Sequence, residues 1–515
     1  MSQSARAGLA AALLGLVLGC LALGPALGWG FVLIQDMVFV PEPEFSRFTF
    51  GLAGGAPRVV PSDAVVTALA QVLPAELVQK AILLGVFVLG CSGAALLVPS
   101  ASLGPRLVAG ACYVWNPYVA ERLLIGQWAL LLGYAGLPWV VRAVWSGRRI
   151  ALAMLPAAVG GFAAMTVTAI TALPAAVAAG GPRVKTVARV AALLALFSLP
   201  WLVPAALRPY GLEGDPVGVA AFAARADTPF GAVGSLLSLG GIWNAYAVPP
   251  GYGDPVGAAA RLLLTPAGAV AFLRGGMPGR WGLAGAAAAG LAVASVGVTA
   301  PGRAVFERAV ELWGGFAVFR DAQQYVAPLA LMAALGLGLL AEHVAAWKAW
   351  VLALVLVPVA VLPTLAWGAL GRLEAVRYPE SWTAAREIIR RDPEPGEVLV
   401  LPFESYRRFP WNGHRALLDP AQRFFAVPGR RVVTNDAVRV GDMVVRSEDP
   451  RAREVERVLV GPAPDLRAAG FRYVIVDAGT VAERERFAQW LRSARVLVDT
   501  GDLRLYRFDG RVAAP

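Results

Sequence analysis

The sequence predicts a polytopic α-helical membrane protein with a soluble α/β domain at its C-terminal end. Hydrophobic residues make up 57% of the 515 residues and charged residues only 16%, whereas soluble domains carry about 25% charged residues. The mean hydropathy is +0.60. Apolar runs of the ~20 residues needed to cross a bilayer recur up to residue 371. After Trp367 the composition becomes that of a soluble protein.

About eleven transmembrane helices are expected from the length of these runs. The segment 171–182 is short and Pro266 interrupts another run, so this count carries a margin of one or two. The candidate segments are residues 8–30, 79–99, 105–124, 127–146, 150–169, 171–182, 187–207, 257–274, 281–299, 323–342 and 349–369.

The loops between these segments predict a cytoplasmic N-terminus. With that orientation the inner loops hold most of the basic residues of the membrane half, which is the positive-inside pattern. These residues are Arg106, Arg142, Arg148, Arg149, Arg183, Lys185, Arg189, Arg274, Arg280 and Lys348.

Acidic residues before the last span lie on the outer side, except for Glu342. They are Asp36, Glu42, Glu44, Asp63, Glu76, Glu121, Glu213, Asp215, Asp227, Asp254, Glu307, Glu311 and Asp321. Because acidic residues contribute little to topology, this one-sided distribution predicts a polar reaction site on the outer face.

The charge balance argues against nucleic-acid binding. The chain has 46 Lys and Arg against 35 Asp and Glu, a net charge of +11. In the membrane half the excess lies in short loops that set topology, not on one soluble face. The C-terminal part is also rich in Arg, which suits an anionic lipid surface or a phosphorylated substrate.

The three cysteines, Cys20, Cys91 and Cys112, all lie in apolar segments and form neither a disulfide framework nor a zinc-ligand spacing. The residues before Cys20 faintly resemble a lipoprotein cleavage site. The apolar run nevertheless continues to Leu33, which favours an uncleaved anchor.

Two domains are expected, a transmembrane domain over residues 1–371 and a soluble extracytoplasmic α/β domain over residues 372–515. The transmembrane domain has three long outer loops, residues 31–78, 208–256 and 300–322. These loops mix aromatic residues with Gly and Pro, and loops of this length are usually functional or disordered. Their hydrophobicity favours folding against the membrane surface.

Alternating strand and helix patterns indicate the α/β character of residues 372–515. Residues 398–401 and 473–476 are short apolar runs suited to buried strands. Two further strand-like runs flank residues 499–502, as in a terminal hairpin. The segment has no phosphate-binding glycine loop, so we expect it to bind substrate or stabilise the protein, and not to be a second catalytic unit.

Asp36 is the strongest candidate for a catalytic residue. It lies just beyond the first apolar span, in the segment Gly30–Val38, where a carboxylate is costly unless it is solvated, paired or used. A carboxylate at this place can act as a general base toward an acceptor hydroxyl. The alternative is an interfacial residue turned toward water, and composition leaves both open.

Asp63 and Glu44 are secondary acidic candidates in the same loop. Asp63 precedes the helical pattern of residues 64–72 and is expected chiefly as a helix N-cap. Glu42 and Glu44 lie among prolines and are expected to be solvated.

The segment Trp115–Trp128 combines aromatic residues with Glu121, Arg122 and Gln127 between two apolar runs. The Arg122 guanidinium could bind a lipid-linked phosphate through two hydrogen bonds, with Glu121 and Gln127 orienting the substrate. The alternative is a salt bridge at the membrane rim beside an aromatic belt.

Arg320, Asp321 and Gln324 form a third polar group at the outer start of a span. Arg320 is a second candidate for phosphate binding, with Asp321 and Gln324 orienting it or the substrate. Alternatively, Arg320 and Asp321 pair with each other, or Asp321 caps the helix that follows. No residues show the spacing of a metal site, and a divalent metal ion as cofactor stays open.

The segments Asn116–Arg122, Gly126–Trp128 and Leu131–Ala135 resemble the membrane domain of actinobacterial arabinofuranosyltransferases of the cell-wall arabinan type. Phe319–Asp321 resembles a later segment of the same proteins. The resemblance implies a GT-C-like fold and a polyprenyl-phosphate-linked sugar as donor. It also implies that an acidic residue in the first outer loop is the catalytic base, a position that Asp36 matches.

The function expected from this resemblance is an inverting glycosyltransferase of arabinofuranosyl or mannosyl type in the bacterial plasma membrane. Its partners would be a polyprenyl-phosphate-linked sugar, a cell-envelope glycan or glycolipid acceptor on the outer face, and membrane lipids, without nucleic acid. Two alternatives stay open: a transporter or flippase of lipid-linked glycans, and a non-catalytic partner of envelope synthases.

Overall fold

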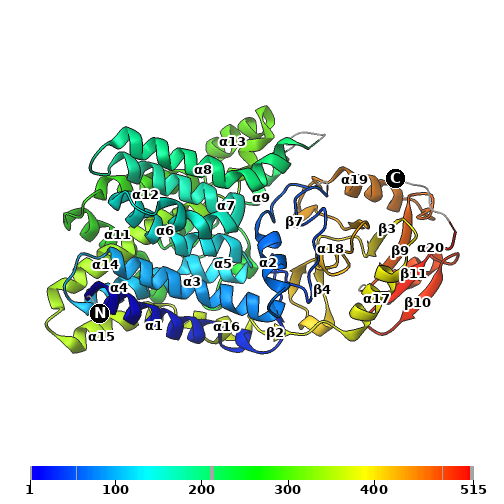
Figure 1. Ribbon diagram of the computed structural model, residues 1–515, viewed down its shortest axis with the longest axis horizontal. Helices are drawn as coiled ribbons and strands as arrows, with labels where there is room; N and C mark the ends of the chain where they lie inside the picture. Colours follow the sequence, from blue (N-terminus) through cyan, green and yellow to red (C-terminus); the bar gives the residue numbers. More distant parts are fainter. Residues whose placement is uncertain (1–2, 54, 209–213, 478–479, 511–515) are drawn as a thin grey trace. The chain divides into compact units, whose positions relative to one another are not determined.

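The computed structural model describes residues 3–53, 55–208, 214–477 and 480–510, which form two compact units (Figure 1). Glu213, one of the predicted outer acids, lies outside these ranges. The first unit comprises Met1–Leu27, Lys80–Leu202 and Gly214–Glu374. The second comprises Gly28–Gln79, Val203–Glu213 and Ala375–Pro515.

The first unit is built from helices, two of which, α3 and α8, continue for a few residues beyond it. The α-helices are α1 (Gln3–Leu23), α3 (Ala75–Leu97), α4 (Leu103–Val114), α5 (Pro117–Leu124), α6 (Trp128–Ser146), α7 (Ile150–Val177), α8 (Arg183–Ala206), α9 (Val217–Ala221), α10 (Gly231–Leu237), α11 (Pro255–Arg274), α12 (Arg280–Val296), α13 (Ala300–Leu312), α14 (Ala327–Ala341), α15 (Lys348–Val361) and α16 (Ala366–Gly371). Short 3₁₀ turns are η1 (Gly24–Leu27), η2 (Ala245–Ala247), η3 (Gly314–Phe319), η4 (Ala322–Val326), η5 (Glu342–Val344) and η6 (Pro363–Leu365).

Seven helices among the described residues are long and apolar enough to cross a membrane, or up to nine if two bent helix pairs each form one span. The expected number of about eleven is therefore not reached. The expected span 150–169 and most of the expected span 171–182 belong to the one long helix α7, which ends at Val177 and whose backbone is irregular at Gly161. A multi-pass membrane protein is nevertheless what these helices indicate.

The expected span 105–124 is broken between α4 and α5. Pro117 opens α5, and a proline disfavours helical geometry in the residue before it. Asn116 is accordingly extended (φ −153°, ψ 168°), and its side chain caps α5 by accepting a hydrogen bond from the Val119 N–H. The break places α5, which carries Glu121 and Arg122, outside the helices that qualify as spans.

Helices α11 and α14 approach each other closely because glycines lie at their contact. A Cβ built on Gly336 would overlap the backbone carbonyl of Gly268, and a Cβ on Gly268 would overlap that of Ala333. Small residues at such contacts let membrane helices pack through van der Waals interactions, since lipid supplies no hydrophobic driving force between them.

The second unit contains a five-stranded sheet with helices and two-stranded ribbons around it. Its helical segments are α2 (Ser62–Ala70), α17 (Glu380–Arg391), η7 (Pro410–Asn412), α18 (Ala421–Phe424), α19 (Pro450–Leu459) and α20 (Val481–Trp490). Its strands are β1 (Phe31–Val32), β2 (Ala375–Val376), β3 (Glu397–Leu401), β4 (Tyr406–Arg408), β5 (Ala416–Leu418), β6 (Val432–Val433), β7 (Val438–Val440), β8 (Met443–Val445), β9 (Phe471–Val476), β10 (Arg495–Asp499) and β11 (Arg504–Arg507).

The strand order of the main sheet is β10-β11-β9-β3-β6. Strand β3 pairs in parallel with β6 and β9, and β9–β11–β10 form the antiparallel edge. The two predicted buried strands and the terminal hairpin are thus confirmed. All residues of β3 and β9 are buried, as expected of parallel strands covered on both faces.

Residues 28–79, which contain the loop 31–78 that was assigned from the sequence to the transmembrane domain, belong to the same unit as residues 375–515. Strand β1 pairs with β2, with Phe31 opposite Val376 and Val32 opposite Ala375. The segment contributes two strand residues and the helix α2 to this unit, so it is an integral part of that fold.

We predict that Gly336→Leu destabilises the protein, because the new side chain collides with the backbone of α11. Overpacking a close contact costs about 1–3 kcal/mol or more, and the melting temperature in detergent should fall accordingly. Gly285→Leu in α12 is the matched control, since a Cβ there meets nothing within 4 Å. Equal melting temperatures for the two variants would contradict the proposed helix contact.

Candidate functional site

Asp36 lies at the tip of a tight turn in the second unit. The Met37 N–H donates to the Ile34 carbonyl at 2.8 Å, and Gln35 adopts a left-handed conformation (φ 47°). Ile34 and Met37 are buried, whereas Asp36 is half-buried. The turn therefore presents one carboxylate from a fixed backbone.

Strand β5 holds this turn through its backbone. The Gln35 N–H donates to the Ala416 carbonyl at 2.7 Å, and the Leu418 N–H donates to the Gln35 carbonyl at 2.8 Å. The Asn412 amide also donates to the Leu33 carbonyl at 3.1 Å. These bonds satisfy buried backbone groups that would otherwise be costly, and they determine the place of residue 36.

The Tyr406 hydroxyl, on β4, donates a hydrogen bond to Asp36 Oδ1. Strand β4 pairs with β5, with Tyr406 opposite Leu418, so one ribbon supplies both the backbone support of the turn and this side-chain contact. Burial first, and then the Asp36 carboxylate, raise the pKa of Tyr406 well above its usual range. The phenol therefore stays protonated and keeps donating at physiological pH.

Asp63 and Glu44, the secondary acidic candidates, are both engaged in ion pairs. Asp63 lies in the first turn of α2 and accepts from Arg423 Nε at 2.7 Å. Glu44 contacts Arg386 at 3.1 Å and also Arg390. The predicted N-cap role of Asp63 is wrong, because Pro61 occupies that position and the carboxylate turns to Arg423. The expectation of a solvated Glu44 is also wrong, because two arginines bind it.

Arg122 is the centre of a polar cluster in the first unit. Its side chain is fully buried, and its Nη1 and Nη2 atoms contact Asp321 Oδ2 at 2.7 Å and Oδ1 at 3.1 Å. Nη1 also donates to Gln127 Oε1 at 2.5 Å, and Nη2 donates to Gln323 Oε1. Such two-pronged pairing with a carboxylate is the strongest arrangement open to a guanidinium.

These contacts decide between the alternatives that the sequence left open. Asp321 pairs with Arg122 instead of with Arg320, and it makes no side-chain cap although it occupies the N-cap position of η4. Glu121 does not pair with Arg122 either, since its Oε2 accepts from Gln323 Nε2 at 3.2 Å. The cluster thus joins residues about 200 positions apart in sequence, with separations of 199 and 202 for the pairs named here.

Glu121, Asp227 and Tyr252 converge around Gly240. A Cβ built on Gly240 would lie 2.9 Å from Glu121 Oε1, 2.8 Å from Asp227 Oδ2 and 2.6 Å from the Tyr252 hydroxyl, so only glycine fits there. Burial first, and then Asp227, raise the pKa of Glu121 well above its usual range. Sequence reasoning did not assign a role to Asp227 or Tyr252, although it singled out their long, aromatic-rich loop.

Arg320 and Gln324 flank this cluster. The Arg320 guanidinium lies over the Phe222 ring, 5.0 Å from its centroid, and the side chain is half-buried. Gln324 is buried, and its backbone carbonyl accepts from the Tyr118 hydroxyl at 3.0 Å. The first unit therefore brings Glu121, Arg122, Gln127 and Asp321 together, whereas Asp36, Glu44 and Asp63 belong to the second unit.

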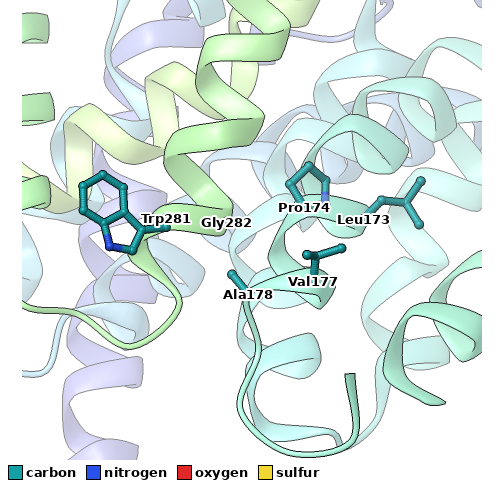
Figure 2. Close-up of a pocket in the computed structure, with 6 residues that line it drawn as sticks. All are labelled: Leu173, Pro174, Val177, Ala178, Trp281 and Gly282. Carbon is teal, nitrogen blue, oxygen red and sulfur yellow. The ribbon is translucent and has the colours of Figure 1, made fainter. Parts of the chain in front are cut away.

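Among the described residues, no group of three or more His, Cys, Asp or Glu is arranged to hold a metal ion. A cavity of about 510 Å³ lies between α7 and α12 (Figure 2). It is lined by Leu173, Pro174, Val177, Ala178, Trp281 and Gly282. None of these residues has a charged side chain, so the cavity supplies no group that could act as an acid, a base or a nucleophile.

We predict that Asp321→Asn destabilises the first unit, because it leaves the buried Arg122 charge without its partner. Breaking a buried ion pair in this way costs about 3–5 kcal/mol, which a drop in melting temperature would report. Glu311→Gln is the control, since its pair with Arg308 is exposed (48% and 72%) and such pairs contribute about 0–1 kcal/mol. Similar small shifts for both variants would contradict the assigned pairing.

No protein-family model matches the sequence, and no curated protein matches it. The fold, however, is similar to that of the arabinofuranosyltransferase AftD from mycobacteria, with a TM-score of 0.60 at 15% sequence identity. A mutant form of AftD matches with a TM-score of 0.63 at 17% identity.

Both matches cover 99% of this chain, but only 40% and 42% of the AftD chains. The chain therefore spans about two fifths of the length of AftD. The predicted resemblance to actinobacterial arabinofuranosyltransferases is confirmed at the level of the fold. The first and second units together are the part of this chain that shares the AftD fold.

Proposed function

We propose that the protein is a membrane glycosyltransferase that transfers a sugar from a polyprenyl-phosphate donor to a cell-envelope glycan or glycolipid. The observation that carries this proposal is the placement of Asp36 in a fixed turn under a tyrosine hydrogen-bond donor. The likeness in fold to AftD, whose name describes an arabinofuranosyltransferase, supports the same class of reaction.

In this proposal Asp36 is the general base. It takes the proton of the acceptor hydroxyl while the acceptor oxygen forms a bond to the anomeric carbon of the donor sugar. The bond from that carbon to the phosphate breaks, and the polyprenyl phosphate leaves with the electron pair. Attack opposite the leaving group inverts the anomeric centre. A carboxylate has several acceptor sites, so it can hold the Tyr406 hydroxyl and the acceptor hydroxyl together.

We assign the donor phosphate to the polar cluster of the first unit. Arg320 is the proposed phosphate contact, because its guanidinium is half-buried above an aromatic ring. Arg122 is fully buried and both of its Nη atoms already donate to protein acceptors, so we give it an indirect part, holding Asp321 and Gln127 in place. Glu121 and Gln324 support the same cluster from within, as buried side chains.

We also propose a cellular location for the protein. The protein is a multi-pass protein of the bacterial plasma membrane with its N-terminus in the cytoplasm, as the positive-inside pattern favours. The first unit supplies the transmembrane domain, and residues 375–515, together with the segment 28–79 of the same second unit, supply the extracytoplasmic domain. The sugar transferred is of arabinofuranosyl or mannosyl type.

We predict that Asp36→Asn lowers kcat by roughly 10²–10⁴-fold, the usual contribution of a general base. Transfer would be measured with the purified full-length protein and a synthetic polyprenyl-phospho-arabinofuranose donor, with a mannose donor in parallel. Glu42→Gln, six residues farther on, is the control and should keep wild-type activity.

Transfer at the wild-type rate by Asp36→Asn would overturn the proposed role of Asp36. Movement of the labelled lipid-linked sugar across liposome membranes, without any transfer product, would instead favour a flippase.

A second prediction concerns Tyr406→Phe, which removes the hydrogen bond to Asp36. A donor stabilises the charged form of a carboxylate, so without it the base becomes protonated at higher pH. We expect the acidic limb of the kcat–pH profile to move to higher pH, and kcat at neutral pH to fall. An unchanged profile would show that Tyr406 does not act on the base.

A further inference from the structure

Arg407, next to Tyr406 on β4, is buried between two aspartates. Successive side chains on a strand point to opposite faces, so Arg407 points away from the face that carries Tyr406. Its Nη1 contacts Asp419 Oδ2 at 3.2 Å, and its Nη2 contacts Asp477 Oδ1. Nη2 also donates to the Leu401 carbonyl at 3.3 Å. The guanidinium is thereby fixed from several directions.

The three partners come from different elements. Asp477 directly follows β9, at the end where Val476 pairs with Leu401 of β3. Asp419 directly follows β5, and its backbone N–H donates to the Ser405 carbonyl at 2.8 Å. Arg407 therefore ties the β4–β5 ribbon to the carboxyl ends of the central parallel strands.

The same ribbon carries both supports of Asp36. Backbone groups of β5 bind Gln35, and the Tyr406 hydroxyl of β4 binds Asp36 itself. A shift or rotation of β4 relative to the main sheet would move Tyr406, because Tyr406 directly precedes Arg407, whose guanidinium is fixed. The position of the hydroxyl thus depends on the Arg407 contacts.

Stability alone does not account for such a cluster, because replacing buried ion pairs by apolar residues is often neutral or stabilising. Its directional contacts, however, define one geometry. Two aspartates face one arginine, and burial, the largest effect, raises the pKa of Asp477 and of Asp419. Asp477 Oδ2 has no hydrogen-bond partner within the described parts of the chain. An amide at position 477 would therefore serve Arg407 as well as a carboxyl group.

We propose that Arg407, Asp419 and Asp477 are positioning residues that hold β4 so that the Tyr406 hydroxyl stays on Asp36. The inference rests on the proposed function, in which Asp36 is the base. Under this proposal Asp477 affects catalysis only by positioning Tyr406. The effect of changing Asp477 should therefore depend on whether Tyr406 is present, which can be measured.

The test is a double-mutant cycle of Asp477→Ala and Tyr406→Phe in the full-length protein, with the polyprenyl-phospho-arabinofuranose donor. Asp477→Ala should lower kcat by about 10- to 100-fold, as small displacements of catalytic groups do, with little change in the donor KM. In the Tyr406→Phe background the same substitution should change kcat by less than about twofold, because coupled residues are not additive. The same fold loss in both backgrounds would overturn the proposal.

Two further variants separate positioning from general damage. Asp477→Asn keeps an acceptor for Arg407 and should retain near wild-type kcat. Asp392→Ala is the matched control, because Asp392, like Asp477, pairs with an arginine, but at the opposite end of β9. Asp392 contacts Arg472 at 2.6 Å and accepts from the Tyr473 hydroxyl at 2.5 Å. It should leave kcat unchanged. A loss in Asp392→Ala equal to that in Asp477→Ala would contradict a specific role.

A readout without turnover keeps this inference separate from the proposed function. With 3-fluorotyrosine at position 406, the ¹⁹F resonance should move in Asp477→Ala toward its position in Asp36→Asn, and stay in Asp477→Asn. If Asp36→Asn is fully active but the resonance moves, the proposed function fails and the positioning link stands. A resonance unmoved by Asp477→Ala overturns the link. If Asp477→Ala does not fold, Arg407→Lys replaces it, with the same expected direction.

Discussion

A guanidinium enclosed by protein must have its charge and its donors met, and this constraint organises both polar clusters. Transfer of an unpaired charge from water into the interior costs several kcal/mol, so a buried arginine draws acceptors from whatever segments pass nearby. Arg122 gathers Asp321, Gln127 and Gln323, and Arg407 gathers Asp419 and Asp477. In each case one side chain determines the relative places of segments far apart in sequence.

These two arginines therefore serve mainly to hold segments of the chain in place, and less to contact substrates. A phosphate could bind the Arg122 Nη atoms only by displacing Asp321 and the side-chain amides of Gln127 and Gln323, which already accept from them. The Arg320 side chain is half-buried over the Phe222 ring. A basic residue close to a predicted reaction site is therefore a poor guide to direct contact with an anion until its burial and its acceptors are known.

Local patterns in the sequence predicted the elements that depend on local physics. The apolar runs 398–401 and 473–476, predicted as buried strands, are strands that lie beside each other in the sheet. Contacts between distant segments were not predictable in the same way. No residue near Tyr406 in the sequence indicates its partner, which lies 370 residues earlier. Pro61 occupies the N-cap position that the sequence pattern favoured for Asp63. Asp477 did carry a signal, because it directly follows a predicted buried strand, and sites gather at the carboxyl ends of strands in α/β sheets.

The partner chosen for Asp36 agrees with the role of a base. Glu44 and Asp63, in the same segment, are bound by arginines, and these charged hydrogen bonds already occupy carboxylate oxygen atoms that an acceptor hydroxyl would need. The Asp36 carboxylate instead accepts a hydrogen bond from a neutral phenol, which orients it. Arg58, whose charge also acts on Tyr406, has Glu448 as its partner at 2.5 Å. In the proposed mechanism, the ion cluster around Arg407 holds Tyr406 in place. Tyr406 in turn orients Asp36, which can still take a proton.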